Sequence, residues 1–181
     1  MQNQLIKRFQ HSPADPWQWD RAVAWDAADI VAMAEEQFQQ EVDQIFQISP
    51  DAYRYAIDLA TVNQRHNLAH EQLTVARVKS TGKLAAYAWI TRGSRPPYSL
   101  EETAEGRMLH LDLALPEITR IRLTVQALTH WELWARACAI PVLVSSTIRS
   151  DSHTFLRLHE QLGYSCRGNI CYKRIGEPHA E

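Results

Sequence analysis

The sequence predicts an α/β (α+β) domain in which helices flank a mixed, mostly antiparallel sheet. Segments near the middle of the chain alternate apolar and polar residues, as half-buried strands do. Segments before and after them repeat apolar residues three and four positions apart, as amphipathic helices do. Proline and glycine residues separate several of these segments. The expected element order is β-α-α-β-β-β-α-β-α-β-β.

The beginning of the chain is expected to be an irregular arm. Residues 1–18 and their immediate neighbours contain two prolines, Trp17 and Trp19 among polar residues. The two indoles need burial, either against their own domain or against a protein partner, where aromatic anchors are favoured. The expected organisation is an arm over residues 1–18, a domain over 19–176 and a tail over 177–181.

Two helices are expected to follow a short strand over residues 21–25. Asp26 or Asp29 would cap a helix that extends to about Phe46. Ser49 would cap the second helix, with Pro50 in its first turn, and this helix would extend to about Asn63.

A hairpin and a central strand are expected next. Residues 72–79 and 84–91 are rich in strand-forming residues and are separated by a turn that contains Gly82. A loop over residues 93–106 leads to a strand over residues 108–115. In that strand the leucines alternate with His110, Asp112 and Ala114.

The last third of the chain is expected to alternate helices and strands. Pro116 ends the central strand, Ser152 can cap the late helix, and Gly163 fits the position just after it. The expected elements are a helix over 117–139, a short buried strand over 141–145, a helix over 153–161, and strands over 164–167 and 170–174.

Composition limits the classes of function. The chain has 181 residues, enough for one domain, with 45% hydrophobic and 22% charged residues, which is typical of a soluble globular protein. A net charge of -2 and the lack of a basic stripe argue against nucleic-acid binding. No apolar run is long enough to span a bilayer, and the first residues lack the apolar stretch of a signal peptide, so a cytoplasmic location is expected.

The three cysteines, Cys138, Cys166 and Cys171, match neither a disulfide framework nor a zinc site. Cys166 and Cys171 could face each other across a hairpin, but reduced thiols are the favoured interpretation. No metal site is expected.

The element order and three local stretches resemble the GNAT superfamily of acetyl-CoA-dependent N-acetyltransferases. Residues 21–30 resemble its opening strand and helix. Residues 111–117 resemble its central strand, which ends in a proline and an acidic residue. Residues 155–164 resemble its late helix, which ends in a Leu-Gly-aromatic turn. The resemblance covers residues 21–175 and implies a GNAT-like fold.

The sequence departs from that family at the loop expected to bind acyl-CoA. The family pattern there is Arg or Gln, two residues, Gly, one residue, Gly or Ala, and its glycines let backbone N–H groups approach the pyrophosphate. Residues 119–124 correspond to it, and Arg122 and Thr124 occupy the glycine positions. Arg120 and Arg122 could bind phosphates through their guanidinium groups, although two solvated basic residues are the simpler interpretation. The candidate cofactor-binding residues are Leu113, Ala114, Leu115, Arg120, Arg122 and Thr124.

The resemblance also implies candidate catalytic residues. The family often has a tyrosine on the late helix, four residues before the turn glycine, and His159 takes that position here. His159 would protonate the leaving thiolate, and Asp112 or His110 would take a proton from the amine. Structural roles for His159 and Asp112 are the simpler alternatives.

Two functions are therefore compatible with the sequence. One is acetyl-CoA-dependent N-acetylation of an amine. The other, which the missing glycines favour, is a non-catalytic structural or interaction protein that binds no cofactor. Residues 152–158 are similar to the late helix of GNAT-like virion proteins of short-tailed bacteriophages, which implies a virion location. Trp17, Trp19, Trp131 and Trp134 would then bind a protein partner or a larger assembly.

Overall fold

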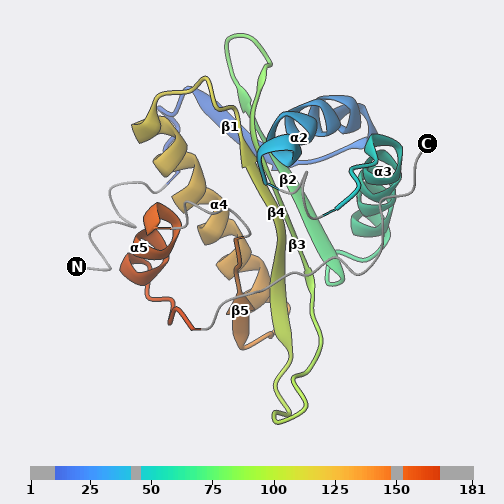
Figure 1. Ribbon diagram of the computed structural model, residues 1–181, viewed down its shortest axis with the longest axis vertical. Coiled ribbons are helices and arrows are strands. Elements are labelled where there is room, and N and C mark those ends of the chain that lie inside the picture. Colours follow the sequence, from blue (N-terminus) through green and yellow to red (C-terminus); the bar gives the residue numbers. More distant parts are fainter. Residues whose placement is uncertain (1–10, 42–45, 148–152, 168–181) are drawn as a thin grey trace.

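The computed structural model describes residues 11–41, 46–147 and 153–167 (Figure 1). The described elements, in chain order, are β1 (Trp17–Arg21), the 3-10 helix η1 (Ala24–Asp26), α2 (Ala27–Glu41), α3 (Pro50–His66), β2 (Glu71–Val78), β3 (Leu84–Arg92), β4 (Thr103–Leu111), α4 (Glu117–Ala137), β5 (Val142–Val144) and α5 (His153–Gln161). The predicted mixed α/β class is confirmed. Within the described ranges, none of the helices is both long enough and apolar enough to cross a membrane.

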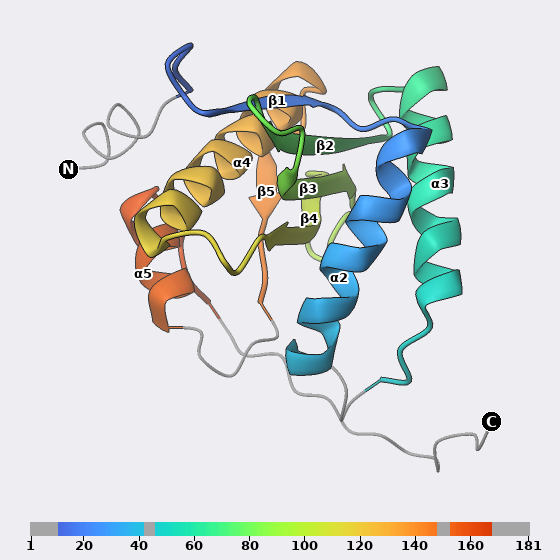
Figure 2. The same ribbon diagram turned by 90° about the horizontal axis from the view of Figure 1, so that it is seen from above.

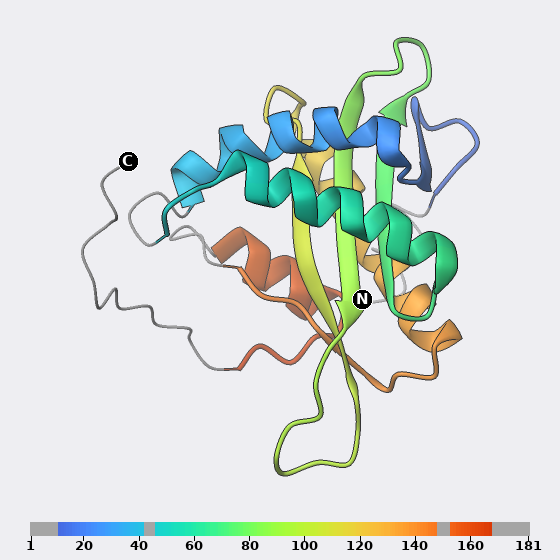
Figure 3. The same ribbon diagram turned by 90° about the vertical axis from the view of Figure 1, so that its right-hand side faces the viewer.

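The five strands form one sheet in the order β1-β2-β3-β4-β5. The first three pairings are antiparallel and only β4 with β5 is parallel, so the prediction of a mostly antiparallel sheet is confirmed. The predicted hairpin is β2 and β3, and Gly82 in its turn has a positive φ of 70°. Helices α2 and α3 lie side by side on one face of the sheet, and α4 and α5 lie on the other (Figures 2 and 3).

Strand alternation divides the core between the two faces. Leu73, Val75 and Tyr87 are fully or almost fully buried and pack with residues of α2 and α3. Ala86 and Ala88 point to the other face and pack with residues of α4. In these parts of β2 and β3, large residues therefore face α2 and α3, and small residues face α4.

The small residues of the sheet make room for tryptophans of α4. Trp131 packs directly on Gly106, where a built Cβ would overlap the indole ring. Trp134 is buried in the same cluster, and its Nε1 donates a hydrogen bond to the carbonyl of Leu68 at 2.7 Å. These two indoles are therefore part of the core of their own domain.

Two tryptophans of β1, Trp17 and Trp19, are held by a polar network on α4. The Oε1 atom of Gln126 accepts a hydrogen bond from Trp17 Nε1 at 2.8 Å and from Trp19 Nε1 at 3.0 Å. The Nε2 atom of Gln126 donates to Asp15, which also forms an ion pair with Arg122. Trp17, Trp131 and Trp134 are thus buried within their own chain and Trp19 is partly buried there, so the burial of these indoles requires no partner.

Capping residues in the sequence predicted the ends of two helices correctly. Ser49 Oγ accepts a hydrogen bond from the Ala52 amide and Pro50 begins α3, as predicted. Gly163 follows α5 with a φ of 89°, and the amides of Gly163 and Tyr164 bond to the carbonyls of Glu160 and His159. This is a Schellman motif, in which a left-handed glycine ends the helix.

Other expected boundaries were wrong. The first strand begins at Trp17 instead of Arg21. Trp17 and Trp19 point to the same face of the sheet and pack in a cluster with Leu123 of α4. The Asp26 carboxylate accepts a hydrogen bond from the Val23 amide, which bends the chain into η1 instead of extending the strand. Residues 164–167 form no strand.

Three further expectations concern the second half of the chain. Strand β4 starts at Thr103 and ends at Leu111, so Asp112 and the residues up to Leu115 lie beyond it in a turn. The strand expected to be buried, β5, is short, and Val142 and Val144 are partly exposed. The strand expected over 170–174, the Ser152 cap and Cys171 lie outside the described residues, while Cys138 and Cys166 are free thiols.

Candidate functional site

A cleft opens where β4 and β5 separate. The two strands pair only from Thr103 with Val142 to Glu105 with Val144, and in the described ranges no strand pairs with the rest of that edge of β4. The register of β3 and β4 shifts next to this point, so that Arg107 is an extra residue, a β-bulge. The result is a cleft of about 860 Å³ along residues 106–111.

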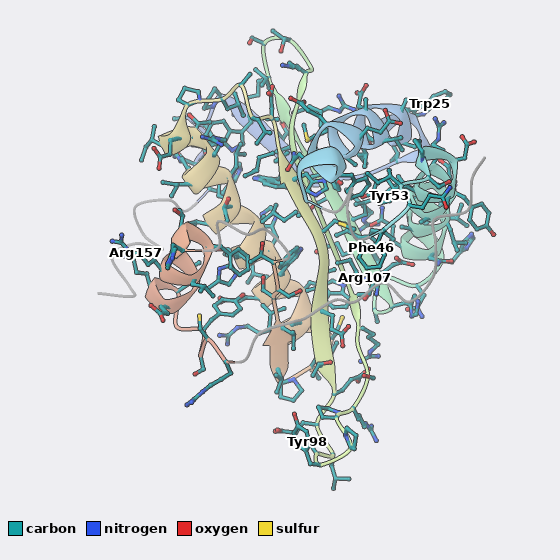
Figure 4. All side chains as sticks on the ribbon, in the orientation of Figure 1. Trp25, Phe46, Tyr53, Tyr98, Arg107 and Arg157 are labelled. Carbon is teal, nitrogen blue, oxygen red and sulfur yellow. The ribbon has the colours of Figure 1, made fainter. Side chains whose placement is uncertain are left out.

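Both helical layers contribute to the walls of this cleft. Phe38 from α2 and Tyr53 from α3 line one side, and Arg120 from α4 and Phe155 from α5 line the other. Figure 4 shows Phe46, Tyr53 and Arg107 together beside β4, whereas Arg157 points outward on the far side of α5. The side with Phe38 and Tyr53 is called the aromatic side below, and the wall also includes Arg107 on β4 and Arg120 on α4.

Two buried donors in the cleft wall have no hydrogen-bond partner in the part of the chain that the structure describes. They are Nε of Arg120 and Nε1 of Trp131. Buried polar groups in native proteins nearly always have partners, so unpartnered donors in a cleft indicate a place where a ligand can supply acceptors.

On the aromatic side, three side chains form a continuous hydrogen-bonded chain. The hydroxyls of Tyr53 and Tyr87 are 2.8 Å apart, and the Tyr87 hydroxyl is 2.6 Å from Nδ1 of His110. Burial raises the pKa of Tyr53 far above its usual value, although the hydrogen bond with Tyr87 opposes this, so the phenol stays protonated. The predicted residue His110 thus belongs to a network whose two tyrosines the sequence analysis missed.

A second polar pair lies on the side formed by α5. His159 is buried, and its two ring nitrogens lie 2.8 Å from the Phe155 carbonyl oxygen (Nδ1) and 2.9 Å from Ser145 Oγ (Nε2). A carbonyl only accepts, so Nδ1 must carry a proton. Burial lowers the pKa of His159, although the bond to Phe155 opposes this. The neutral ring therefore presents a lone pair at Nε2 to the Ser145 hydroxyl, which lines the cleft.

Known structures share the fold of this chain. No model of a known protein family matches the sequence, and no curated protein matches it significantly. An aminoglycoside 6′-N-acetyltransferase from Acinetobacter baumannii superimposes with a TM-score of 0.64 and 13% identity, over 90% of this chain and 99% of that one. The fold is that of the GNAT acetyltransferases.

Two other GNAT-fold structures are similar over the same extent. Glucosamine-6-phosphate N-acetyltransferase from Arabidopsis thaliana has a TM-score of 0.64 and 8% identity, over 90% of this chain and all of that one. The aminoglycoside acetyltransferase AAC(6')-Iy, bound to the bisubstrate analogue CoA-S-monomethyl-acetylneamine, has a TM-score of 0.65 and 10% identity, over 88% and 98% of the two chains. At these identities the likeness establishes the fold alone.

Within the GNAT fold of this chain, the stretch that departs from the glycine-rich pattern is helical. Helix α4 begins at Glu117, and the amides of Thr119 and Arg120 already donate to the Pro116 carbonyl. The hydroxyl of Thr124 donates to the Arg120 carbonyl. Residues 119–124 thus use their backbone groups within the helix, and phosphates would have to be bound there by side chains.

The candidate cofactor-binding residues have different positions in the GNAT fold. Leu113, Arg120 and Thr124 line the cleft. Arg122 points elsewhere, forming the ion pair with the buried Asp15 carboxylate and lying over the Trp17 ring. Leu115 is partly buried and packs against the core, and the amide of Ala114 donates to the Asp112 carboxylate.

Asp112 is engaged outside the cleft wall. Its carboxylate accepts a hydrogen bond from Lys83 Nζ at 2.6 Å and one from the Ala114 amide at 3.0 Å. Burial raises the pKa of Asp112, but these bonds outweigh that effect and the net pKa is lowered. A carboxylate stabilised in this way is a weak base, which favours the structural alternative for Asp112.

No three His, Cys, Asp or Glu side chains in the described ranges come together as a metal site would require.

We expect the free energy of unfolding to decrease as the pH falls from about 7 to about 5. Burial lowers the pKa of both His159 and His130, and the nearby His11 adds to the effect on His130. Below about pH 6.5 the unfolded chain therefore binds protons that the native state does not, which destabilises the fold until the lowered pKa values are passed. Each unit of lowering contributes about 1.4 kcal/mol.

Urea unfolding at several pH values would measure this dependence. The double variant His159→Gln, His130→Gln should show a shallower decrease than the natural protein over the same interval. A decrease of equal steepness in the variant would show that these two imidazoles are not its source.

Proposed function

We propose that this protein transfers an acyl group from acyl-CoA to an amine. The observation that carries the proposal is the cleft beside the free edge of β4, with two unpartnered donors buried in its wall. The similar structures bear names of aminoglycoside and glucosamine-6-phosphate N-acetyltransferases, which supports an amino sugar as a first class of acceptor to test. The sequence had favoured a non-catalytic role, and the cleft is the reason for preferring the enzyme.

The residues of the cleft would bind the phosphates of acyl-CoA through a side chain instead of through backbone amides. Arg120 would bind its phosphates by the guanidinium group, since residues 119–124 use their backbone amides within helix α4. The Trp131 indole N–H is the second available donor. Bound acyl-CoA would supply an acyl group activated as a thioester. The aromatic side, with Phe38 and Tyr53, would face the acceptor.

A second candidate is a non-catalytic component of an assembly, such as a virion protein. The start of α4 at Glu117 favours this second candidate. Residues 119–124 are helical there, where the family pattern has a glycine-rich loop that binds a pyrophosphate. Such a protein would need no cofactor and would act through a protein partner. Trp17, Trp131 and Trp134 are buried and Trp19 is partly buried, so these indoles give no support to a docking role, and the binding surface would lie elsewhere.

Calorimetric titration with acetyl-CoA and with CoA tests the proposal first. Saturable binding, followed by release of free thiol from acetyl-CoA when aminoglycosides, glucosamine 6-phosphate or simple primary amines are added, is the expected result. A folded protein that binds neither ligand up to millimolar concentration would reject the enzyme and leave the non-catalytic candidate.

A further inference from the structure

Ser145 and His159 have the geometry of a nucleophile and its base. Ser145 follows directly after β5, lines the cleft and is half-buried. Its Oγ is 2.9 Å from Nε2 of His159, whose other nitrogen is fixed by the Phe155 carbonyl 2.8 Å away. Nucleophilic serines are recognised by this pattern: a base within hydrogen-bond reach that is itself oriented by a third group.

The surroundings fix the orientation of the imidazole. The Phe155 ring lies 3.8 Å from the His159 ring between centroids, and the Tyr164 ring meets it edge-on at 4.8 Å. The Schellman turn at Gly163 also uses the His159 carbonyl, so the helix end around the residue is fixed. The ring is thus held with Nδ1 as donor and Nε2 as acceptor, the tautomer that can take a proton from a hydroxyl.

This arrangement reverses the role expected for His159. A neutral imidazole whose only proton is donated to the Phe155 carbonyl has no proton to give to a leaving group at the start of a reaction. It can accept one, and the group from which it can accept is the Ser145 hydroxyl.

We propose that Ser145 is a catalytic nucleophile that carries the acyl group as an ester between donor and acceptor. Ser145 Oγ attacks the acyl carbonyl, and its proton passes to Nε2 of His159. The bond between the acyl carbon and its leaving group breaks, and the leaving group takes that proton. An amine or water then attacks the Ser145 ester, gives its proton to Nε2, and the proton returns to Oγ. The assignment of acyl-CoA as the donor rests on the proposed function. The assignment of Ser145 as the nucleophile does not.

The test uses p-nitrophenyl acetate, an activated ester that needs no CoA site, and a fluorophosphonate, which labels activated serines. Incubation of the full chain should add one acetyl or one phosphonyl group, located at Ser145 by peptide mass spectrometry. Ser145→Ala should remove the adduct, and His159→Gln should slow its formation at least tenfold. Ser146→Ala is the matched control, because the neighbouring serine also lines the cleft, and it should be labelled like the natural protein.

The outcomes separate this inference from the proposed function. No adduct at Ser145, or equal labelling of the Ser145→Ala and natural proteins, would overturn the nucleophile. An unchanged labelling rate in a folded His159→Gln variant would overturn the role of His159 as its base. An adduct at Ser145 from the ester, combined with no calorimetric binding of acetyl-CoA, would support the nucleophile and reject acyl-CoA as its donor.

Discussion

Replacing Arg120 with glutamate is expected to weaken acetyl-CoA binding at least tenfold. Arg120 lines the cleft, and its buried Nε has no partner in the described ranges, so this donor can bind a phosphate there. Hydrogen bonds to charged groups contribute about 1.5–3 kcal/mol, and reversing the charge adds repulsion. Since about 1.4 kcal/mol corresponds to a factor of ten, the loss should be easily measured by calorimetry.

The matched control for that measurement is Arg157→Glu. It makes the same change of charge at an exposed arginine that points away from the cleft on α5 (Figure 4). This variant should bind acetyl-CoA within about twofold of the natural protein at 0.15 M salt, where exposed charges are largely screened. Equal weakening by the two substitutions would mean that Arg120 contributes only through net charge and does not contact the phosphates.

Replacing Arg122 with alanine is expected to lower the free energy of unfolding by about 3 kcal/mol. The partner of Arg122 is the carboxylate of Asp15, which is completely buried, and removing the arginine leaves that charge without its counter-ion. The hydrogen bonds to Asp15 from Gln126 and from the Ser12 amide remain, so the loss should be near the lower limit for a broken buried pair. For a chain of this length the melting temperature should fall by roughly 6–12 °C.

Arg120→Ala serves as the comparison for this measurement, since Arg120 lies on the same turn of α4 and forms no ion pair in the described ranges. Its urea unfolding curve should stay within about 0.5 kcal/mol of that of the natural protein. If Arg122→Ala unfolds at the same urea concentration as Arg120→Ala, the ion pair with Asp15 is not formed in solution. Arg122 would then be available to a ligand after all.

Local patterns predicted most of the fold. Alternation in β2 and β3, the turn at Gly82, the Ser49 cap and the Gly163 turn depend on residues close together in the sequence, and all are confirmed. The errors concern contacts with distant residues. Strand β1 begins at Trp17 because its indole bonds to Gln126 on α4, and no pattern around Trp17 contains that information.

The candidate site was predicted in part. His110, Leu113, Arg120 and Thr124 were candidates and do line the cleft. Ser145 was missed because its significance depends on the ring of His159, on another element. Tyr53 and Tyr87 were missed for the same reason, although the position of Tyr87 on an alternating strand, directly across from His110, was a usable signal.

The sequence by itself determined the order of the elements from β1 to α5 and the absence of glycines from residues 119–124, because both are local properties of the chain. Only the tertiary structure decided what the substituted residues do. Arg120 and Arg122 look equivalent in sequence, yet helix α4 directs one into the cleft and the other onto the buried Asp15 carboxylate. A charged side chain takes its role from the partner that the fold brings to it, and that partner can lie anywhere in the chain.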